Sequence, residues 1–133
     1  MDIFQAVRTL SLPPGQYVVF GSGPLAAHGI RETADVDLFV TTELYQSLKR
    51  AGWAEKTQVG GSSCLSIGVY EAYDTWRSGE HFLVPEELIA AAEMINGVPF
   101  APLEYVLSWK KALGRPKDLV DVKLIERHHS CGE

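Results

Sequence analysis

Two short apolar runs, one followed by Gly-Ser and the other preceded by an aspartate, constrain the fold of this chain more than any other feature. Residues 17–20 read Tyr-Val-Val-Phe and end at Gly21-Ser22, and a second run covers 36–40. The twelve residues between Ser22 and Asp35 are enough for one short helix and a turn. A Gly-Ser step from a strand into a helix exposes backbone N–H groups that bind phosphate readily. The pattern therefore predicts strand, short helix and strand, with a phosphate site at the first junction.

Asp35 and Asp37 stand at the start of the second apolar run. Alternate residues of a strand share one face, about 6–7 Å apart, so the two carboxylates are expected to point the same way. Carboxylates held close together repel each other unless a cation neutralises them, and hard oxygen ligands suit Mg²⁺ or Mn²⁺. The pair therefore predicts a divalent-metal site beside the phosphate site.

Length and composition place the chain among ordinary folded domains. Its 133 residues, 46% hydrophobic and 22% charged, fit one domain over 1–133, and the net charge of -5 disfavours a surface that coats nucleic acid. No apolar run approaches the roughly 18 residues of a membrane span, and the N-terminus does not resemble a secretory signal. We therefore expect a cytoplasmic protein with no membrane contact, in which Cys64 and Cys131 are free thiols.

Periodicity and turn residues predict a mixed sheet flanked by helices, an α/β (α+β) fold with helices at the C-terminus. Helices are expected over 2–10, 22–29 and 41–51, from 85, over 103–113, and from 116. Strands are expected over 16–20, 36–40, 53–58, 63–72, 94–95 and 98–100. Turns are expected at Gly60-Gly61-Ser62-Ser63 and at Asn96-Gly97. Residues 128–133 are expected to form a frayed tail, which disfavours a metal site at His128-His129-Ser130-Cys131.

Residues 21–26 also fit the dinucleotide-binding pattern G-x-G-x-x-G/A. That pattern requires an acidic residue at the end of the second strand, whereas Asp35 and Asp37 come at its beginning. The chain is also short for the six-stranded sheet of that fold. We therefore set the dinucleotide interpretation aside.

The stretch 20–38 resembles the nucleotidyltransferase superfamily of the polymerase-beta type. The shared pattern is an apolar residue with Gly-Gly or Gly-Ser, a spacer of this length, and then Asp-apolar-Asp/Glu-apolar. Residues 109–121 resemble the K…R…KD..D segment of the minimal branch that contains the abortive-infection toxins of toxin–antitoxin systems. Together the two similarities extend from about residue 17 to 125.

The resemblance implies a role for each matching residue. Gly21 and Ser22 would hold a nucleoside triphosphate, and Asp35 and Asp37 would bind the metal ions. A third carboxylate from a neighbouring strand would complete the metal site and help to activate the acceptor. Glu71, inside an apolar strand, is favoured for this role over Asp74, which reads as a turn residue at the strand end.

Further matching residues lie near the C-terminus. Lys110 matches the family's helix lysine and would meet a phosphate, and Asp118 matches its acid. For Asp118 and Asp121, a salt bridge or a place at a helix start is at least as good an explanation. Arg31 and Thr33 are expected to shape the turn before the aspartates.

The sequence thus predicts an enzyme that uses Mg²⁺ (or Mn²⁺) and a nucleoside triphosphate to transfer a nucleotidyl group to a hydroxyl of an RNA end, a small molecule or a protein. The chain has little beyond the catalytic core, so the acceptor would bind on the final helices or on a second subunit, in a homodimer or with a partner protein. The alternative is a non-catalytic module of the same fold, antitoxin-like or partner-binding. An incomplete set of carboxylates would favour the module.

Overall fold

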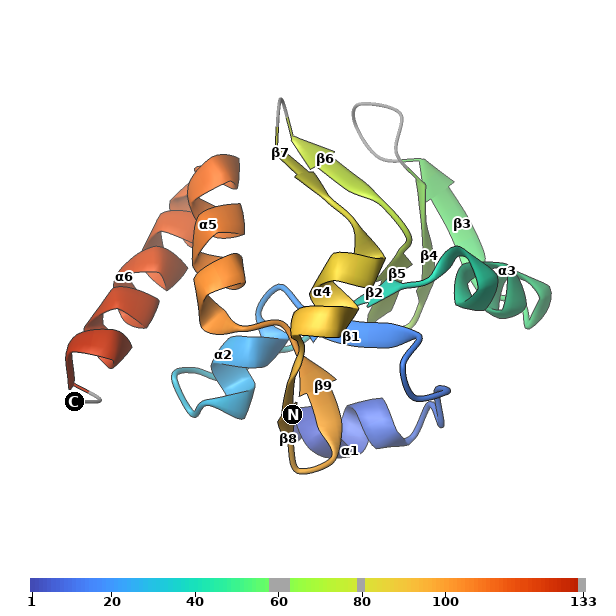
Figure 1. The fold of residues 1–133 in the computed structure, drawn as a ribbon, viewed down its shortest axis with the longest axis horizontal. Coiled ribbons are helices and arrows are strands. Elements are labelled where there is room, and N and C mark those ends of the chain that lie inside the picture. The colour runs from blue at the N-terminus through green and yellow to red at the C-terminus, as the bar shows by residue number, and fades with distance from the viewer. Residues whose placement is uncertain (58–62, 79–80, 132–133) are drawn as a thin grey trace.

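A seven-stranded mixed sheet forms the centre of the molecule, and helices cover both of its faces (Figure 1). The computed structural model describes residues 1–57, 63–78 and 81–131. Strands follow the spatial order β3-β4-β5-β2-β1-β9-β8, and β6 and β7 form a separate hairpin. The strands are β1 (Tyr17–Phe20), β2 (Val36–Val40), β3 (Ala54–Thr57), β4 (Ser63–Ile67), β5 (Tyr70–Tyr73), β6 (Trp76–Ser78), β7 (His81–Leu83), β8 (Glu93–Ile95) and β9 (Val98–Phe100). The helices are α1 (Ile3–Arg8), α2 (Gly23–Ala27), α3 (Thr42–Arg50), α4 (Pro85–Ala91), α5 (Leu103–Leu113) and α6 (Pro116–Cys131).

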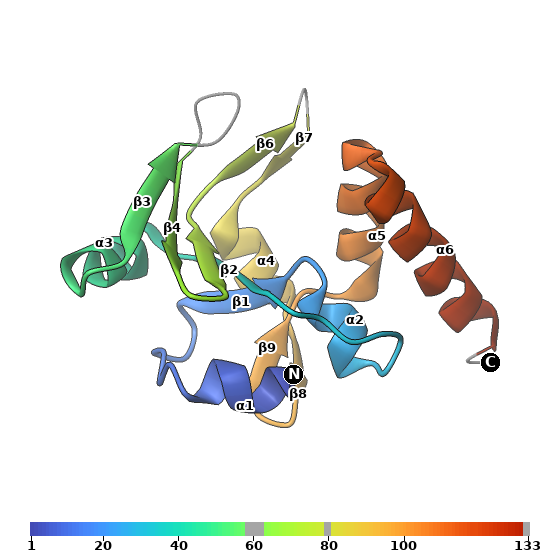
Figure 2. The same cartoon turned by 180° about the vertical axis from the view of Figure 1, so that it is seen from behind.

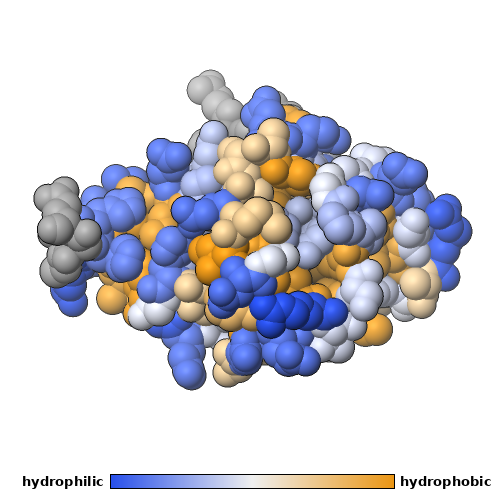
Figure 3. All heavy atoms as spheres, turned by 60° about the horizontal axis from the view of Figure 1, so that its bottom comes forward, coloured by the Kyte–Doolittle hydropathy of each residue, from blue (hydrophilic) through white to orange (hydrophobic). Residues whose placement is uncertain are grey.

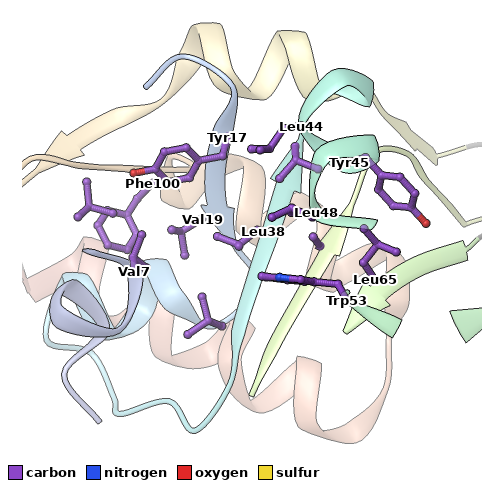
Figure 4. Close-up of a cluster of buried hydrophobic side chains, with 14 of the residues drawn as sticks. Val7, Tyr17, Val19, Leu38, Leu44, Tyr45, Leu48, Trp53, Leu65 and Phe100 are labelled. Atoms are coloured by element: carbon purple, nitrogen blue, oxygen red, sulfur yellow. The ribbon is translucent and has the colours of Figure 1, made fainter. Parts of the chain in front are cut away.

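The central strands β1 and β2 are antiparallel, whereas β2 pairs with β5 and β1 pairs with β9 in parallel. All four residues of β1 are buried, which is typical of a strand covered on both faces. Val19 and Leu38 belong to the cluster on one face, together with side chains of α1 and α3 (Figure 4). Val18 and Phe39 belong to the cluster on the other face. The alternation of side chains along a strand therefore divides one apolar run between two cores.

The second cluster lies between the sheet and the C-terminal half of the chain. It contains Leu88 of α4, Trp109 of α5 and Ile125 of α6. Phe20 is its aromatic centre, since its ring lies 4.8 Å from that of Phe39 and 5.1 Å from that of Trp109. Helices α5 and α6 pack side by side in both views of the ribbon (Figures 1 and 2). This packing places α6, the last helix, next to the β1–α2 junction near the start of the chain.

The fold class and most of the elements agree with the sequence-based prediction. Strand β2 has the predicted bounds, and Gly114 ends α5 in a left-handed conformation with φ of 64°. Asn96 and Gly97 form the predicted tight turn, with φ of 50° and 80°. The mixed sheet flanked by helices is thus confirmed.

Three expectations differ from the structure or fall outside it. The single strand predicted over 63–72 is two strands, because Gly68 (φ 57°) and Val69 form a turn between β4 and β5. Residues 128–133 were expected to fray; of these, 128–131 continue α6, and 132–133 lie outside the described residues. The predicted loop at 60–63 lies, except for Ser63, outside the described residues.

The face of the molecule that carries α1 and the β8–β9 hairpin mixes exposed apolar and hydrophilic side chains (Figure 3). Met94 on β8 is 63% exposed. Within the described ranges, no helix is both long enough and apolar enough to cross a membrane.

Candidate active site

The antiparallel register of β1 and β2 brings the two predicted site elements together. Phe20 pairs with Asp37, so Gly21 continues β1 directly beside the Asp37 side chain. A Cβ atom at Gly21 would lie 2.5 Å from Asp37 Oδ2, and Gly21 has a φ of 69°. Both the close approach and the left-handed backbone require glycine here. The turn and the carboxylate therefore form one compact unit.

The two aspartates differ in their surroundings. Asp35 precedes β2 and is exposed, whereas Asp37 lies within the strand and is half-buried. Thr33 is buried, and its hydroxyl donates to the Asp35 carbonyl oxygen at 3.0 Å and accepts from the Asp35 amide at 3.4 Å. The turn before Asp35 is thus shaped by Thr33, as the sequence suggested.

Glu71 is the carboxylate that the sheet places next to Asp37. The parallel register of β2 and β5 pairs Asp37 with Glu71, so the two side chains share one face of the sheet. The Tyr73 hydroxyl donates to Glu71 Oε1 at 3.3 Å, and Lys56 Nζ lies 3.5 Å from Glu71 Oε2. Asp74 follows the end of β5, where burial is the main cause that raises its pKa. Of the two candidates for the third carboxylate, Glu71 is therefore the one adjacent to Asp37.

The carboxylates produce an unfavourable concentration of negative charge. Burial, followed by the charges of Glu71 and Asp35, raises the pKa of Asp37 from 3.8 to about 7, against the opposing effect of Lys110 and Lys117. The ion pairs of the described residues include neither Asp35 nor Asp37. A site of this kind gains most from a cation, and oxygen donors suit Mg²⁺ or Mn²⁺.

The carboxylate oxygens suit such an ion, but they do not form a complete set of ligands. In the described part of the chain, no three His, Cys, Asp or Glu side chains are already gathered closely enough to hold a metal. Glu71 is also paired with Lys56, which belongs to β3, whereas Asp37 belongs to β2 on the other side of β5 in the strand order.

Ser22 follows Gly21 and lies at the N-terminal end of α2. Its side chain makes no capping hydrogen bond to the helix. Its Oγ instead accepts a hydrogen bond from Arg31 Nη2 at 2.7 Å. Arg31 also donates to Asp121 from Nε at 2.7 Å and from Nη2 at 2.9 Å. The β1–α2 junction is therefore connected through Arg31 to α6.

A buried group of charges joins α5 to α6 beside this junction. Lys110 is only 3% exposed, and its Nζ lies 2.9 Å from Asp121 Oδ2 and 3.9 Å from Asp118 Oδ1. Asp118 also accepts from Arg115 Nε at 2.6 Å. Burial alone would raise the pKa of Asp121, but hydrogen bonds from Arg31 and Lys110 outweigh it and lower that pKa. Asp118 and Asp121 therefore hold the Lys110 ammonium group in place.

The β1–α2 turn, the two aspartates and the charged residues of the α5–α6 region line one cleft of about 280 Å³. This volume is near the lower end of the range of about 300–1,000 Å³ for small-molecule sites. The N-terminal half contributes the turn and the two aspartates, and the C-terminal half contributes basic side chains. The residues around the cleft include Gly21, Ser22, Asp35, Asp37, Lys110, Arg115, Lys117 and Asp118. Every predicted site residue except Glu71 is thus on the cleft wall, and Glu71 stands beside Asp37.

Arg31, Arg115, Lys117 and Asp121 also border the cleft. Sequence reasoning gave Arg31 only a turn-shaping role, and it gave Arg115 and Lys117, within the segment that resembles the family, only a salt bridge with Asp118; Arg115 does form that pair. Asp118 and Asp121 are three residues apart, so they share one face of a helix. That spacing could have indicated that both carboxylates face the same cleft. No sequence signal links Arg31 to Asp121, which lies 90 residues away.

Comparison with solved structures identifies the fold. A protein of Thermotoga maritima with a provisional description as a nucleotidyltransferase matches with a TM-score of 0.61 and 20% identity, over 90% of this chain and 89% of that one. ANT(2")-Ia, solved in complex with adenylyl-2"-tobramycin, matches with a TM-score of 0.51 and 18% identity, over 93% of this chain and 83% of that one. No protein-family model and no curated protein matches the sequence. The chain has a nucleotidyltransferase-like fold, which confirms the resemblance at that level.

Proposed function

We propose that this protein is a metal-dependent nucleotidyltransferase that transfers a nucleotidyl group from a nucleoside triphosphate to an acceptor hydroxyl. The observation that carries the proposal is the single cleft in which two aspartates adjoin the Gly21-Ser22 turn and face basic side chains. The structural neighbours support the same class, since ANT(2")-Ia was solved with adenylyl-2"-tobramycin. The acceptor is a hydroxyl of an RNA end, a small molecule or a protein.

In this proposal Asp35, Asp37 and Glu71 hold Mg²⁺ or Mn²⁺. The bound ion would neutralise charge on the phosphate oxygens. Gly21 lets the triphosphate approach the backbone, and glycine is also required here because a side chain would meet Asp37. The Ser22 hydroxyl donates a hydrogen bond to a phosphate oxygen.

At the α-phosphorus, the transfer makes one bond and breaks one. The acceptor oxygen bonds to the α-phosphorus, pyrophosphate leaves with the electron pair of the broken P–O bond, and the hydroxyl proton passes to a carboxylate. Glu71 suits this last role because it is half-buried beside Asp37 and its Tyr73 hydrogen bond orients it. Arg115 and Lys117, both exposed on the cleft, neutralise the leaving pyrophosphate.

A non-catalytic binding module is the second candidate, and one observation favours it. Glu71 already has a cationic partner in Lys56, at 3.5 Å. If Glu71 stays with Lys56 and does not bind the metal, the carboxylate set is incomplete and the fold serves only to bind a nucleotide or a partner protein.

Calorimetry with ATP, CTP, GTP and UTP, each with and without Mg²⁺, tests the proposal. We expect Mg²⁺-dependent binding of at least one nucleotide, and loss of that binding in the double variant Asp35→Ala/Asp37→Ala. Glu126→Ala is a matched control, since Glu126 is exposed and pairs with Lys111 away from the cleft. Absence of binding, or binding that the double variant retains, refutes the proposed function.

A second pair of variants separates the enzyme from the module. Glu71→Gln should reduce transfer of a labelled nucleotidyl group by 100-fold or more, about the scale of a lost general base. Asp74→Asn should leave transfer within about twofold, because Asp74 follows the end of β5 and, unlike Glu71, is not the residue that pairs with Asp37. Equal losses in the two variants would contradict the assignment of Glu71.

A further inference from the structure

Arg31 contacts two distant parts of the chain at the edge of the proposed triphosphate site. Its Nη2 donates to Ser22 Oγ at 2.7 Å, and its Nε and Nη2 donate to the two carboxylate oxygens of Asp121 at 2.7 and 2.9 Å. Asp121 is 4% exposed and is held in turn by Lys110. The order of contacts is Ser22, Arg31, Asp121, Lys110.

The orientation of the guanidinium group is fixed on more than one side. Its fork binds Asp121 through two bonds, and Nη1 donates to the carbonyl oxygen of Glu32 at 2.7 Å. A planar group held by several partners at once cannot rotate without losing several hydrogen bonds. Arg31 is therefore a rigid donor toward Ser22.

The bond from Arg31 determines what the Ser22 hydroxyl can do. A hydroxyl has one proton to donate and lone pairs that accept. Arg31 fills an acceptor position of Oγ, and the side chain makes no cap bond to α2. The Ser22 proton therefore remains to be donated, on a residue that lines the cleft.

We propose that Arg31 is a positioning residue for the triphosphate, which holds Ser22 so that the hydroxyl proton is donated to a phosphate oxygen in the cleft. Arg31 acts through Ser22 and is not itself a phosphate ligand. Asp121 holds Arg31 in place and so connects α6 to the β1–α2 junction. This inference rests on the proposed function, because it requires that the cleft binds a triphosphate.

The competing explanation is a purely structural brace between the loop before β2 and α6. Both explanations predict that Arg31→Ala lowers stability, so stability alone does not separate them. They differ in how Arg31 and Ser22 affect ligand binding together. Arg31→Lys adds a second distinction, because it keeps the positive charge but loses the fork.

Calorimetry with inorganic triphosphate and Mg²⁺ tests the inference independently of base preference. The variants are Arg31→Ala, Arg31→Lys, Ser22→Ala and the double variant Arg31→Ala/Ser22→Ala. Val7→Ala is the control for general destabilisation, since Val7 is buried in the cluster on the opposite face of the sheet. Thermal denaturation identifies the temperature range in which every variant is folded.

We expect Arg31→Ala, Arg31→Lys and Ser22→Ala each to weaken binding about tenfold, and Val7→Ala to leave it within about twofold. The double variant should bind within about twofold of Ser22→Ala, because Arg31 acts through Ser22. Three results overturn the inference alone: additive losses of about 100-fold in the double variant, wild-type affinity in Arg31→Lys, or unchanged binding in Arg31→Ala. If the wild-type protein binds neither triphosphate nor any nucleotide, the proposed function fails and the inference fails with it.

Discussion

Replacing Asp37 by asparagine should stabilise the metal-free protein at alkaline pH, although Asp37 is central to the proposed site. The pKa of Asp37 is about 7 in the folded protein, against 3.8 for an ordinary aspartate. Between these two values the folded state binds more protons than the unfolded chain. The Asp37 contribution to stability is therefore largest at acidic pH and is lost as the pH rises through about 4 to 7.

The magnitude follows from the separation of the two pKa values. A separation of about 3 corresponds to about 4 kcal/mol, at 1.36 kcal/mol for each pKa unit. Asp37 is half-buried, so water screens part of its repulsion by Glu71 and Asp35. We expect Asp37→Asn to gain about 2 kcal/mol at about pH 8.5, which corresponds to roughly 5–10 °C in Tm for a chain of this size.

Urea unfolding in the presence of EDTA, at about pH 5 and 8.5, measures this gain. The gain should be smaller at the lower pH, because Asp37 of the folded wild-type protein is then largely protonated and the charge repulsion is relieved. Asp35→Asn is the matched control, because Asp35 is exposed, and it should change stability by less than about 0.5 kcal/mol. Excess Mg²⁺ should stabilise the wild-type protein and not Asp37→Asn. A variant that is less stable than wild type at the higher pH, or a gain equal at both pH values, would refute this reasoning.

Two further substitutions test the packing around the cleft. Gly21→Ala should lose more stability than Gly29→Ala and should also lose Mg²⁺ binding: φ is 69° and 70° at the two sites, but only the Gly21 Cβ would meet Asp37. The left-handed backbone alone costs an alanine about 1–2 kcal/mol at either site. Equal melting temperatures for the two variants would therefore contradict a clash between the Gly21 Cβ and Asp37. Lys110→Met should destabilise the protein by about 3 kcal/mol, because it removes the buried cation that Asp118 and Asp121 share and leaves each carboxylate with only its arginine partner. Lys111→Met removes an exposed ion pair and should cost less than about 1 kcal/mol in the same denaturation assay, so similar losses would contradict the buried network.

The parts of this fold that local patterns determine were predictable from the sequence. Strand β2 with Asp37, and the end of α5 at Gly114, follow from apolar runs and glycine positions within a few residues. The turn at Gly68 was missed because the apolar pattern continues across it. The β6–β7 hairpin was not predicted, since its two strands have only three residues each.

The candidate site divides in the same way. The sequence identified Asp35, Asp37 and Gly21 because they lie within 17 residues of one another in a recognisable order. It also favoured Glu71 over Asp74, and the β2–β5 register places Glu71 beside Asp37. The contact of Arg31 with Asp121 depends on how α6 packs against the sheet. A single sequence carries no information on such a long-range contact.

The most direct test of the account is a crystal structure with Mn²⁺ and a nucleoside triphosphate that calorimetry has shown to bind. The anomalous signal of manganese locates the ion independently of the protein density. We expect a manganese peak in contact with Asp35 and Asp37, with triphosphate oxygens beside Gly21 and Ser22. A manganese ion bound elsewhere, or a nucleotide bound without any metal at the two aspartates, would contradict it.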